Sequence, residues 1–147
     1  MRPTRDETML NVAFALAQRS TCKRRGVGCV LTDELGRILS TGHNGVAKGE
    51  QHCTDVPCPG ADCPSGTGLD KCQAVHAEQN AIMFCPDVMK IHTCYVTVSP
   101  CIHCVKMLMN TGCTRIVFGL EYPHSDSEKL WTKNGRTWIN ATTRKII

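Results

Sequence analysis

Residues 93–104, TCYVTVSPCIHC, contain a strand and the start of a helix in one short segment. The first half is apolar and β-branched, as expected of a strand. Pro100 suits the first position of a helix, where its missing N–H is not needed, and Gly112 can end that helix after Thr111. A second apolar segment follows at 115–119, so the order strand, helix, strand predicts two parallel strands of one sheet.

The segments on either side extend this sheet. Apolar residues recur at helical spacing after Thr4 and Glu7, whose separation is that of a capping box. The other expected elements are a helix at 6–19, a hairpin with strands at 27–32 and 37–41, a helix at 74–85, a helix near 127–134 and a strand near 136–140. Helices that alternate with strands indicate an α/β fold with a partly parallel sheet. Because the chain has 147 residues and no evident linker, we expect a single domain over 1–147.

Composition narrows the classes of function. The net charge of +4 is compatible with an anionic substrate such as a nucleotide, but the charge is too weak and too scattered to predict a surface for duplex nucleic acid. No segment approaches the roughly 18 apolar residues that span a bilayer, and the first residues lack the pattern of a signal peptide. We therefore expect a soluble, cytoplasmic protein without a membrane partner.

Eleven cysteines are many for a chain of this length. Without an export signal, such cysteines are more often buried, metal-bound or catalytic than paired in disulfides. Two short motifs stand at expected helix starts, HAE at 76–78 and PCIHC at 100–104. Together they form H-x-E…P-C-x-x-C, the signature of zinc-dependent nucleobase deaminases.

The spacing of these residues suits a catalytic zinc ion. Cys101 and Cys104 share one helix face, and with the His76 imidazole they supply three protein ligands, which leaves a fourth position for water. His76 and Glu78 lie two residues apart, so they can converge only where a helix begins. Both helix starts then direct their positive dipole ends toward the metal and favour the thiolates.

Glu78 is not needed as a ligand and is therefore the expected catalytic proton carrier. Zinc lowers the pKa of a bound water. We expect Glu78 to take a proton from that water, deliver it to N3 of a cytosine that is attacked at C4, and help the amine leave as ammonia. Taken alone, a C-x-x-C pair is also typical of a redox site or of a structural zinc knuckle. His103, between the two cysteines, is not expected to bind the metal.

Beyond these motifs, the chain resembles the deoxycytidylate (dCMP) deaminases of the cytidine deaminase superfamily over residues 5–122. The segments that carry the resemblance are STCKRRGVG at 20–28, TGHNG at 41–45, the cysteine-rich insert, CQAVHAEQNAI at 72–82 and SPC at 99–101. The resemblance implies a three-layer α/β sandwich with a central five-stranded mixed sheet, and hydrolysis of dCMP to dUMP and ammonia. It also implies homohexamers that dCTP activates and dTTP inhibits, with Mg²⁺ accompanying the regulatory triphosphate.

In relatives, a Gly-Tyr-Asn-Gly element holds the regulatory nucleotide. The corresponding residues here are Gly42, His43, Asn44 and Gly45, with histidine in place of tyrosine. The alternative for these residues is a simple turn, because Gly-Asn-Gly sequences are common in turns.

The resemblance also assigns residues to the substrate. Asn44 is expected to hydrogen-bond the sugar, and the basic run 23–25, which ends at Arg25, to meet the 5′-phosphate. Tyr122 is expected to flank the base. Backbone groups at the base edge are expected from Ala77 and Ser99. The alternatives are a solvated basic loop for 23–25 and core packing for Tyr122.

The stretch 42–71 has no periodicity and is rich in Gly, Pro and Cys, and a loop of this length is usually functional or held in place by something. Some phage relatives carry a second, structural zinc in the regions of Cys22 and Cys53, which predicts a second metal here. Four further cysteines fall in expected strands or at helix ends and are expected in the core: Cys29, Cys85, Cys94 and Cys113.

Other functions stay open at this point. Among enzymes, the alternatives are a deaminase of free cytidine, a tRNA adenosine deaminase and a riboflavin-pathway deaminase. The basic run at 23–25 disfavours the free nucleoside, and a tRNA editor should show a broader basic face. Outside enzymes, the alternatives are a zinc-stabilised binding module, which leaves Glu78 unexplained, and a nucleotide-binding regulator that has lost the chemistry.

Overall fold

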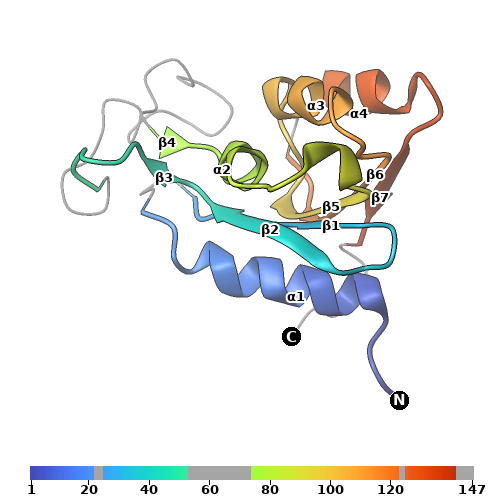
Figure 1. Cartoon of the computed structure of the whole chain (residues 1–147), viewed down its shortest axis with the longest axis horizontal. Helices are drawn as coiled ribbons and strands as arrows, with labels where there is room; N and C mark the ends of the chain where they lie inside the picture. The colour runs from blue at the N-terminus through green and yellow to red at the C-terminus, as the bar shows by residue number, and fades with distance from the viewer. Residues whose placement is uncertain (22–24, 53–73, 123–124, 142–147) are drawn as a thin grey trace.

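The computed structural model describes residues 1–21, 25–52, 74–122 and 125–141. Its elements are α1 (Arg5–Ala17), β1 (Gly28–Thr32), β2 (Ile38–His43), β3 (Gly45–Val46), β4 (Ala74–Val75), α2 (Ala77–Met83), the 3-10 helix η1 (Val88–Lys90), β5 (Thr93–Val98), α3 (Ile102–Met109), β6 (Arg115–Leu120), α4 (Ser125–Thr132) and β7 (Thr137–Asn140). Figure 1 shows three layers, with α1 on one face of the central sheet and α2, α3 and α4 on the other. Within the described part of the chain, no helix has both the length and the apolar composition needed to cross a membrane.

The central sheet is mixed. Its strand order is β2-β1-β5-β6-β7. Strand β1 is antiparallel to both β2 and β5, whereas β5, β6 and β7 run parallel. The parallel part arises because α3 connects β5 to β6 and α4 connects β6 to β7. The predicted α/β sandwich with a five-stranded mixed sheet is therefore confirmed.

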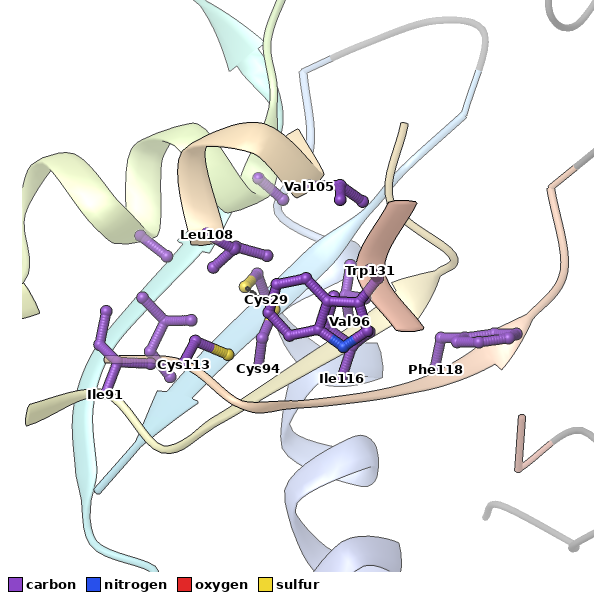
Figure 2. Packing of buried hydrophobic residues seen from close by; sticks show 13 residues of the cluster. Cys29, Ile91, Cys94, Val96, Val105, Leu108, Cys113, Ile116, Phe118 and Trp131 are labelled. Carbon is purple, nitrogen blue, oxygen red and sulfur yellow. Dashed lines mark hydrogen bonds between the residues drawn. The ribbon is translucent and has the colours of Figure 1, made fainter. Parts of the chain in front are cut away.

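Alternating side chains of the strands divide the core between the two faces of the sheet. Val30, Tyr95 and Val117 face α1, where Leu10 and Ala13 pack on them. The larger cluster lies beneath α2, α3 and α4, and Figure 2 shows Trp131 of α4 packed among its residues. The predicted core cysteines belong to this cluster: Cys29, Cys94 and Cys113 are buried, and Cys85 packs against it half-buried.

Three helix starts differ by two or more residues from the predicted ones, and the local backbone explains two of them. His76 is the N-cap of α2 with extended backbone, so the helix begins at Ala77, and Ala74–Val75 pairs with β3 as a short strand. Cys101 is likewise the N-cap of α3, so Pro100 precedes the helix and does not open it. Helix α4 begins two residues earlier than predicted, at Ser125, where acidic residues in its first turn favour a helix start.

Candidate metal centre and active site

Three side chains that can bind a metal meet where α2 and α3 begin. The Nδ1 atom of His76 lies 3.3 Å from Sγ of Cys104 and 3.6 Å from Sγ of Cys101. All three donor atoms lie within 4.8 Å of one another. Zinc bonds of about 2.3 Å to sulfur and about 2.0–2.1 Å to nitrogen place tetrahedral S and N ligands about 3.6 Å apart. The donor set therefore fits Zn²⁺ and leaves one of its four positions for another ligand.

The electrostatics of the three donors favour a cation between them. The contact with Cys104 lowers the pKa of the Cys101 thiol to about 3, so a thiolate is present at neutral pH. The same contact raises the pKa of Cys104, and the bond to Cys101 raises the pKa of His76. A coupled group of this kind releases its shared protons when a metal binds. The positive ends of α2 and α3 add to the stabilisation of the thiolates.

Glu78 lies beside this donor set without belonging to it. It is in the first turn of α2, only 5% of its surface is exposed, and its carboxyl contacts the Cys104 thiol. Burial is the main reason why the pKa of Glu78 is raised. The arrangement expected from the H-x-E motif is therefore present: the helix start lets residues 76 and 78 point to the same place.

Two neighbours of Glu78 contact the site and were not predicted from the sequence. The backbone N–H of His76 donates to Oε1 of Gln79 at 2.9 Å, which completes a capping box at the start of α2. The side chain of Asn80 donates to the carbonyl of His43 at 2.9 Å. The first contact has a sequence signal, because a Gln three residues after an N-cap is half of a capping box. The second joins residues distant in sequence and has none.

Residues 42–45 connect two parts of the site. A Cβ on Gly42 would lie 2.3 Å from the Ala77 carbonyl oxygen and 2.7 Å from the Ala81 nitrogen, so glycine here lets β2 pack closely on α2. A Cβ on Gly45 would meet Oγ1 of Thr21 at 2.6 Å. Close packing therefore accounts for both glycines, and their predicted role in binding a regulatory nucleotide stays a prediction.

The Asn44 side chain is buried and holds the segment that carries Arg25. Its Oδ1 accepts the N–H of Val27 at 2.8 Å, and its Nδ2 donates to the carbonyl of Arg25 at 2.7 Å. The structure thus gives Asn44 a positioning contact, and its contact with the sugar stays a prediction. His43, beside it, is half-buried, with Nδ1 3.4 Å from the Asn44 carbonyl oxygen.

Among the other predicted substrate residues, Ser99 and Tyr122 follow β5 and β6, whereas Arg25 precedes β1 and Ala77 opens α2. The guanidinium carbon of Arg25 is 5.7 Å from the centre of the Tyr122 ring. Oγ of Ser99 accepts the N–H of Tyr122 at 2.6 Å, and Ala77 is buried at the start of α2. The remaining predictions, namely the basic residues at 23 and 24 and the second zinc at Cys22 and Cys53, lie outside the described residues.

A mixed sheet that brings one imidazole, two thiols and a buried carboxylate together at two helix starts defines a zinc-dependent deaminase. Comparison with known proteins leads to the same class. Residues 3–120 match the family described as the cytidine and deoxycytidylate deaminase zinc-binding region. The chain belongs to this family.

Individual relatives share most of the chain. Deoxycytidylate deaminase of Mycobacterium phage D29 is 39% identical over 127 residues, which cover 82% of this chain and 98% of the phage protein. The deoxycytidylate deaminase of Saccharomyces cerevisiae is 32% identical over 83% of this chain, but the match covers only 39% of the yeast protein. The crystal structure of dCMP deaminase from cyanophage S-TIM5 in complex with dCMP and dUMP has a TM-score of 0.73 and 26% identity, covering 95% of this chain and 98% of that one.

Proposed function

We propose that this protein hydrolyses dCMP to dUMP and ammonia. The observation that carries the proposal is a cation that two contacts connect to the segment of a metal donor. The Arg25 guanidinium lies over Tyr122, and Tyr122 is hydrogen-bonded to Ser99. Ser99 is two residues before the metal-binding Cys101. A guanidinium there suits the 5′-phosphate of a nucleotide, which a free nucleoside lacks. The similarity to phage enzymes named dCMP deaminases supports the same substrate.

The chemistry needs a nucleophilic water and a proton carrier. When bound by His76, Cys101 and Cys104, Zn²⁺ supplies a water of lowered pKa as the nucleophile. Glu78 accepts a proton from this water as the oxygen forms its bond to C4 of the cytosine ring. Glu78 then gives this proton to N3. It next takes the remaining proton from the oxygen now bonded to C4 and passes it to the amine. The C4–N bond breaks, and ammonia leaves with the proton that Glu78 delivered.

The remaining side chains hold the substrate in this proposal. Asn44 has its Oδ1 and one N–H of its amide occupied by the segment 25–27, and its second N–H is the group that we assign to the sugar. Tyr122 flanks the base with its ring face opposite Arg25. Backbone groups of Ala77 and Ser99 read the base edge. Burial of both residues at the two sides of the metal donors is consistent with this assignment.

The test is ammonia release from dCMP, CMP, deoxycytidine and cytidine, measured side by side on the zinc-loaded protein. We expect dCMP to have the highest kcat/KM, and deoxycytidine a lower value because its KM is higher. Equal kcat/KM for dCMP and deoxycytidine would refute the phosphate site, and preference for a purine nucleoside would refute the substrate class.

Regulation and assembly are further predictions that rest on the resemblance. We propose that dCTP with Mg²⁺ activates the enzyme and dTTP inhibits it through residues 42–45, and that the protein forms homohexamers. Residues 42–45 contact both α2 and the segment 25–27, so a ligand bound there acts on residues that position the site. The dCMP saturation curve should shift when either triphosphate is added at millimolar concentration. An unmoved curve, or a monomer in sedimentation, would remove the respective prediction.

A further inference from the structure

We propose that Gln79 and Asn80, adjacent residues of α2, are positioning residues with separable tasks. Gln79 holds the metal ligand His76, and Asn80 holds the substrate segment 25–27 through residues 43 and 44. The substrate half of this inference rests on the proposed function, whereas the metal half does not. Neither residue contacts the reacting atoms, so both act through the groups that they hold.

The first task follows from the start of α2. His76 is the N-cap, so its backbone N–H lies outside the hydrogen bonds of the helix and needs another partner. Oε1 of Gln79 is that partner at 2.9 Å. Helix α2 contains only 7 residues, so it depends on its packing and on contacts such as this cap. Loss of the Gln79 acceptor therefore frees the residue whose ring faces Cys101 and Cys104.

The second task follows from a chain of hydrogen bonds that leads away from the metal. Asn80 donates to the carbonyl of His43 at the end of β2. The next residue, Asn44, accepts from the N–H of Val27 and donates to the carbonyl of Arg25. Each contact joins a side-chain amide to backbone, so the chain fixes the path of the main chain at 25–27. These hydrogen bonds therefore connect the backbone of Arg25, whose guanidinium lies over Tyr122, to α2.

Helix geometry explains how two adjacent residues can contact different parts of the molecule. Successive residues of an α-helix point about 100° apart. Gln79 turns back to its own N-cap, and Asn80 turns toward β2. Gly42 packs closely on Ala77 and Ala81, so β2 and α2 have little room to move relative to each other. The hydrogen bond from Asn80 therefore fixes residues 43 and 44 relative to the helix.

The sizes of the two effects can be bounded. Loss of a helix-cap hydrogen bond typically costs about 0.5–2 kcal/mol, which corresponds to roughly a 2- to 30-fold change in an equilibrium such as metal binding. We expect a similar increase in the rate of zinc loss for Gln79→Met, which keeps the length and helix propensity of the side chain but has no strong acceptor. A neutral hydrogen bond contributes about 1 kcal/mol, which corresponds to roughly a fivefold change. We expect Asn80→Ala to raise KM for dCMP by about that factor with kcat little changed.

The experiment compares both variants of the zinc-loaded protein by two readouts that do not need activity. The first is the rate of zinc transfer to a chromogenic chelator, and the second is hydrogen exchange at the N–H of Val27. Gln79→Met should speed zinc loss and leave Val27 exchange unchanged. Asn80→Ala should speed Val27 exchange and leave zinc loss unchanged. Kinetics with dCMP and deoxycytidine then show whether the KM change depends on the phosphate.

Matched variants separate positioning from general destabilisation. Thr4→Ala removes the corresponding N-cap contact of α1, where the N–H of Glu7 donates to the Thr4 hydroxyl, and should change neither readout. Gln79→Glu keeps an acceptor at the same distance and should restore slow zinc loss. If Gln79→Met fails to fold, slow zinc loss in Gln79→Glu still supports the inference, and fast loss overturns it. If Asn80→Ala fails to fold, Asn80→Leu, which fills the space without a donor, takes its place.

Either of two results would overturn the proposal: the two variants change both readouts together, or Thr4→Ala changes them as much. If instead the protein does not act on dCMP but zinc loss and Val27 exchange respond as expected, the proposed substrate is wrong and the two positioning roles stand.

Discussion

The Arg25 guanidinium lies over the ring of Tyr122, with 5.7 Å between the guanidinium carbon and the ring centre. These residues lie far apart in the sequence, and each is held by a separate backbone contact. Asn44 fixes the main chain of Arg25, and Ser99 fixes the N–H of Tyr122. Because Arg25 is exposed, this cation–π contact contributes only about 0.5–1 kcal/mol. The pair therefore places a positive charge at the end of β6 before any substrate binds.

Arg25→Gln should raise KM for dCMP by about one to two orders of magnitude, because a hydrogen bond to a charged group contributes about 1.5–3 kcal/mol. The KM for deoxycytidine, which has no phosphate, should change little. Steady-state kinetics with both substrates measure this difference. Arg37→Gln, at an exposed position of the β1–β2 hairpin, is the control. An equal rise in both KM values would show that Arg25 does not bind the phosphate.

Glu78→Gln should retain zinc and lower kcat for deamination by about 10²- to 10⁴-fold, the range of a lost general acid–base. Glutamine has nearly the same volume as glutamate, so the buried position beside Cys104 stays filled. Zinc content and kcat should be measured on the same preparation. A zinc-loaded variant with nearly unchanged kcat would take the proton-transfer role away from Glu78.

The sequence was sufficient for the parts of the fold that depend on local pattern. The buried strand at 93–98, the hairpin and the order of helices and strands follow from apolar periodicity, and the structure confirms them. The donor set His76, Cys101 and Cys104 could also be predicted, because a metal restricts ligand type and spacing so strongly.

Other features depend on contacts that no local pattern encodes. The pairing of β3 with β4 involves two residues on each side, too few for a period of two to be visible. The contact of Asn80 with His43 and the position of Arg25 over Tyr122 join residues 37 and 97 positions apart, so only the tertiary fold brings them together. Helix starts were misplaced because His76 and Cys101 are unusual N-caps, selected for the metal and not for capping.

Removal of zinc should abolish deamination, and added Zn²⁺ should restore it. If the predicted second site at Cys22 and Cys53 exists, metal analysis of the purified protein should give about two zinc ions per chain, and Cys22→Ser should lose one of them with the catalytic zinc retained. A value near one zinc per chain for the unmodified protein would eliminate the second site. The count should be made by elemental analysis after removal of loosely bound metal.

Gly42→Ala should destabilise the protein and weaken the metal site together. The added Cβ would lie 2.3 Å from the Ala77 carbonyl oxygen, so α2 must move away from β2. Overpacking of this kind typically costs about 1–3 kcal/mol. Urea unfolding and the rate of zinc loss measure the two effects. Gly49→Ala, where no atom lies within 4 Å of the new Cβ, should lower stability through its positive φ alone and leave zinc loss unchanged.

Tyr95 should make the stability of the fold depend on alkaline pH. Its hydroxyl donates to Oδ1 of Asp6 at 2.7 Å, and burial raises the pKa of Tyr95 to about 12. An exposed tyrosine has a pKa of about 10. Because the folded value is the higher one, the phenol contributes its full stability below pH 10 and loses it as the pH rises through 12. Urea unfolding from pH 8 to 12 should therefore show a decline in unfolding free energy that is smaller in Tyr95→Phe. An equal decline in the variant would assign the effect to other groups.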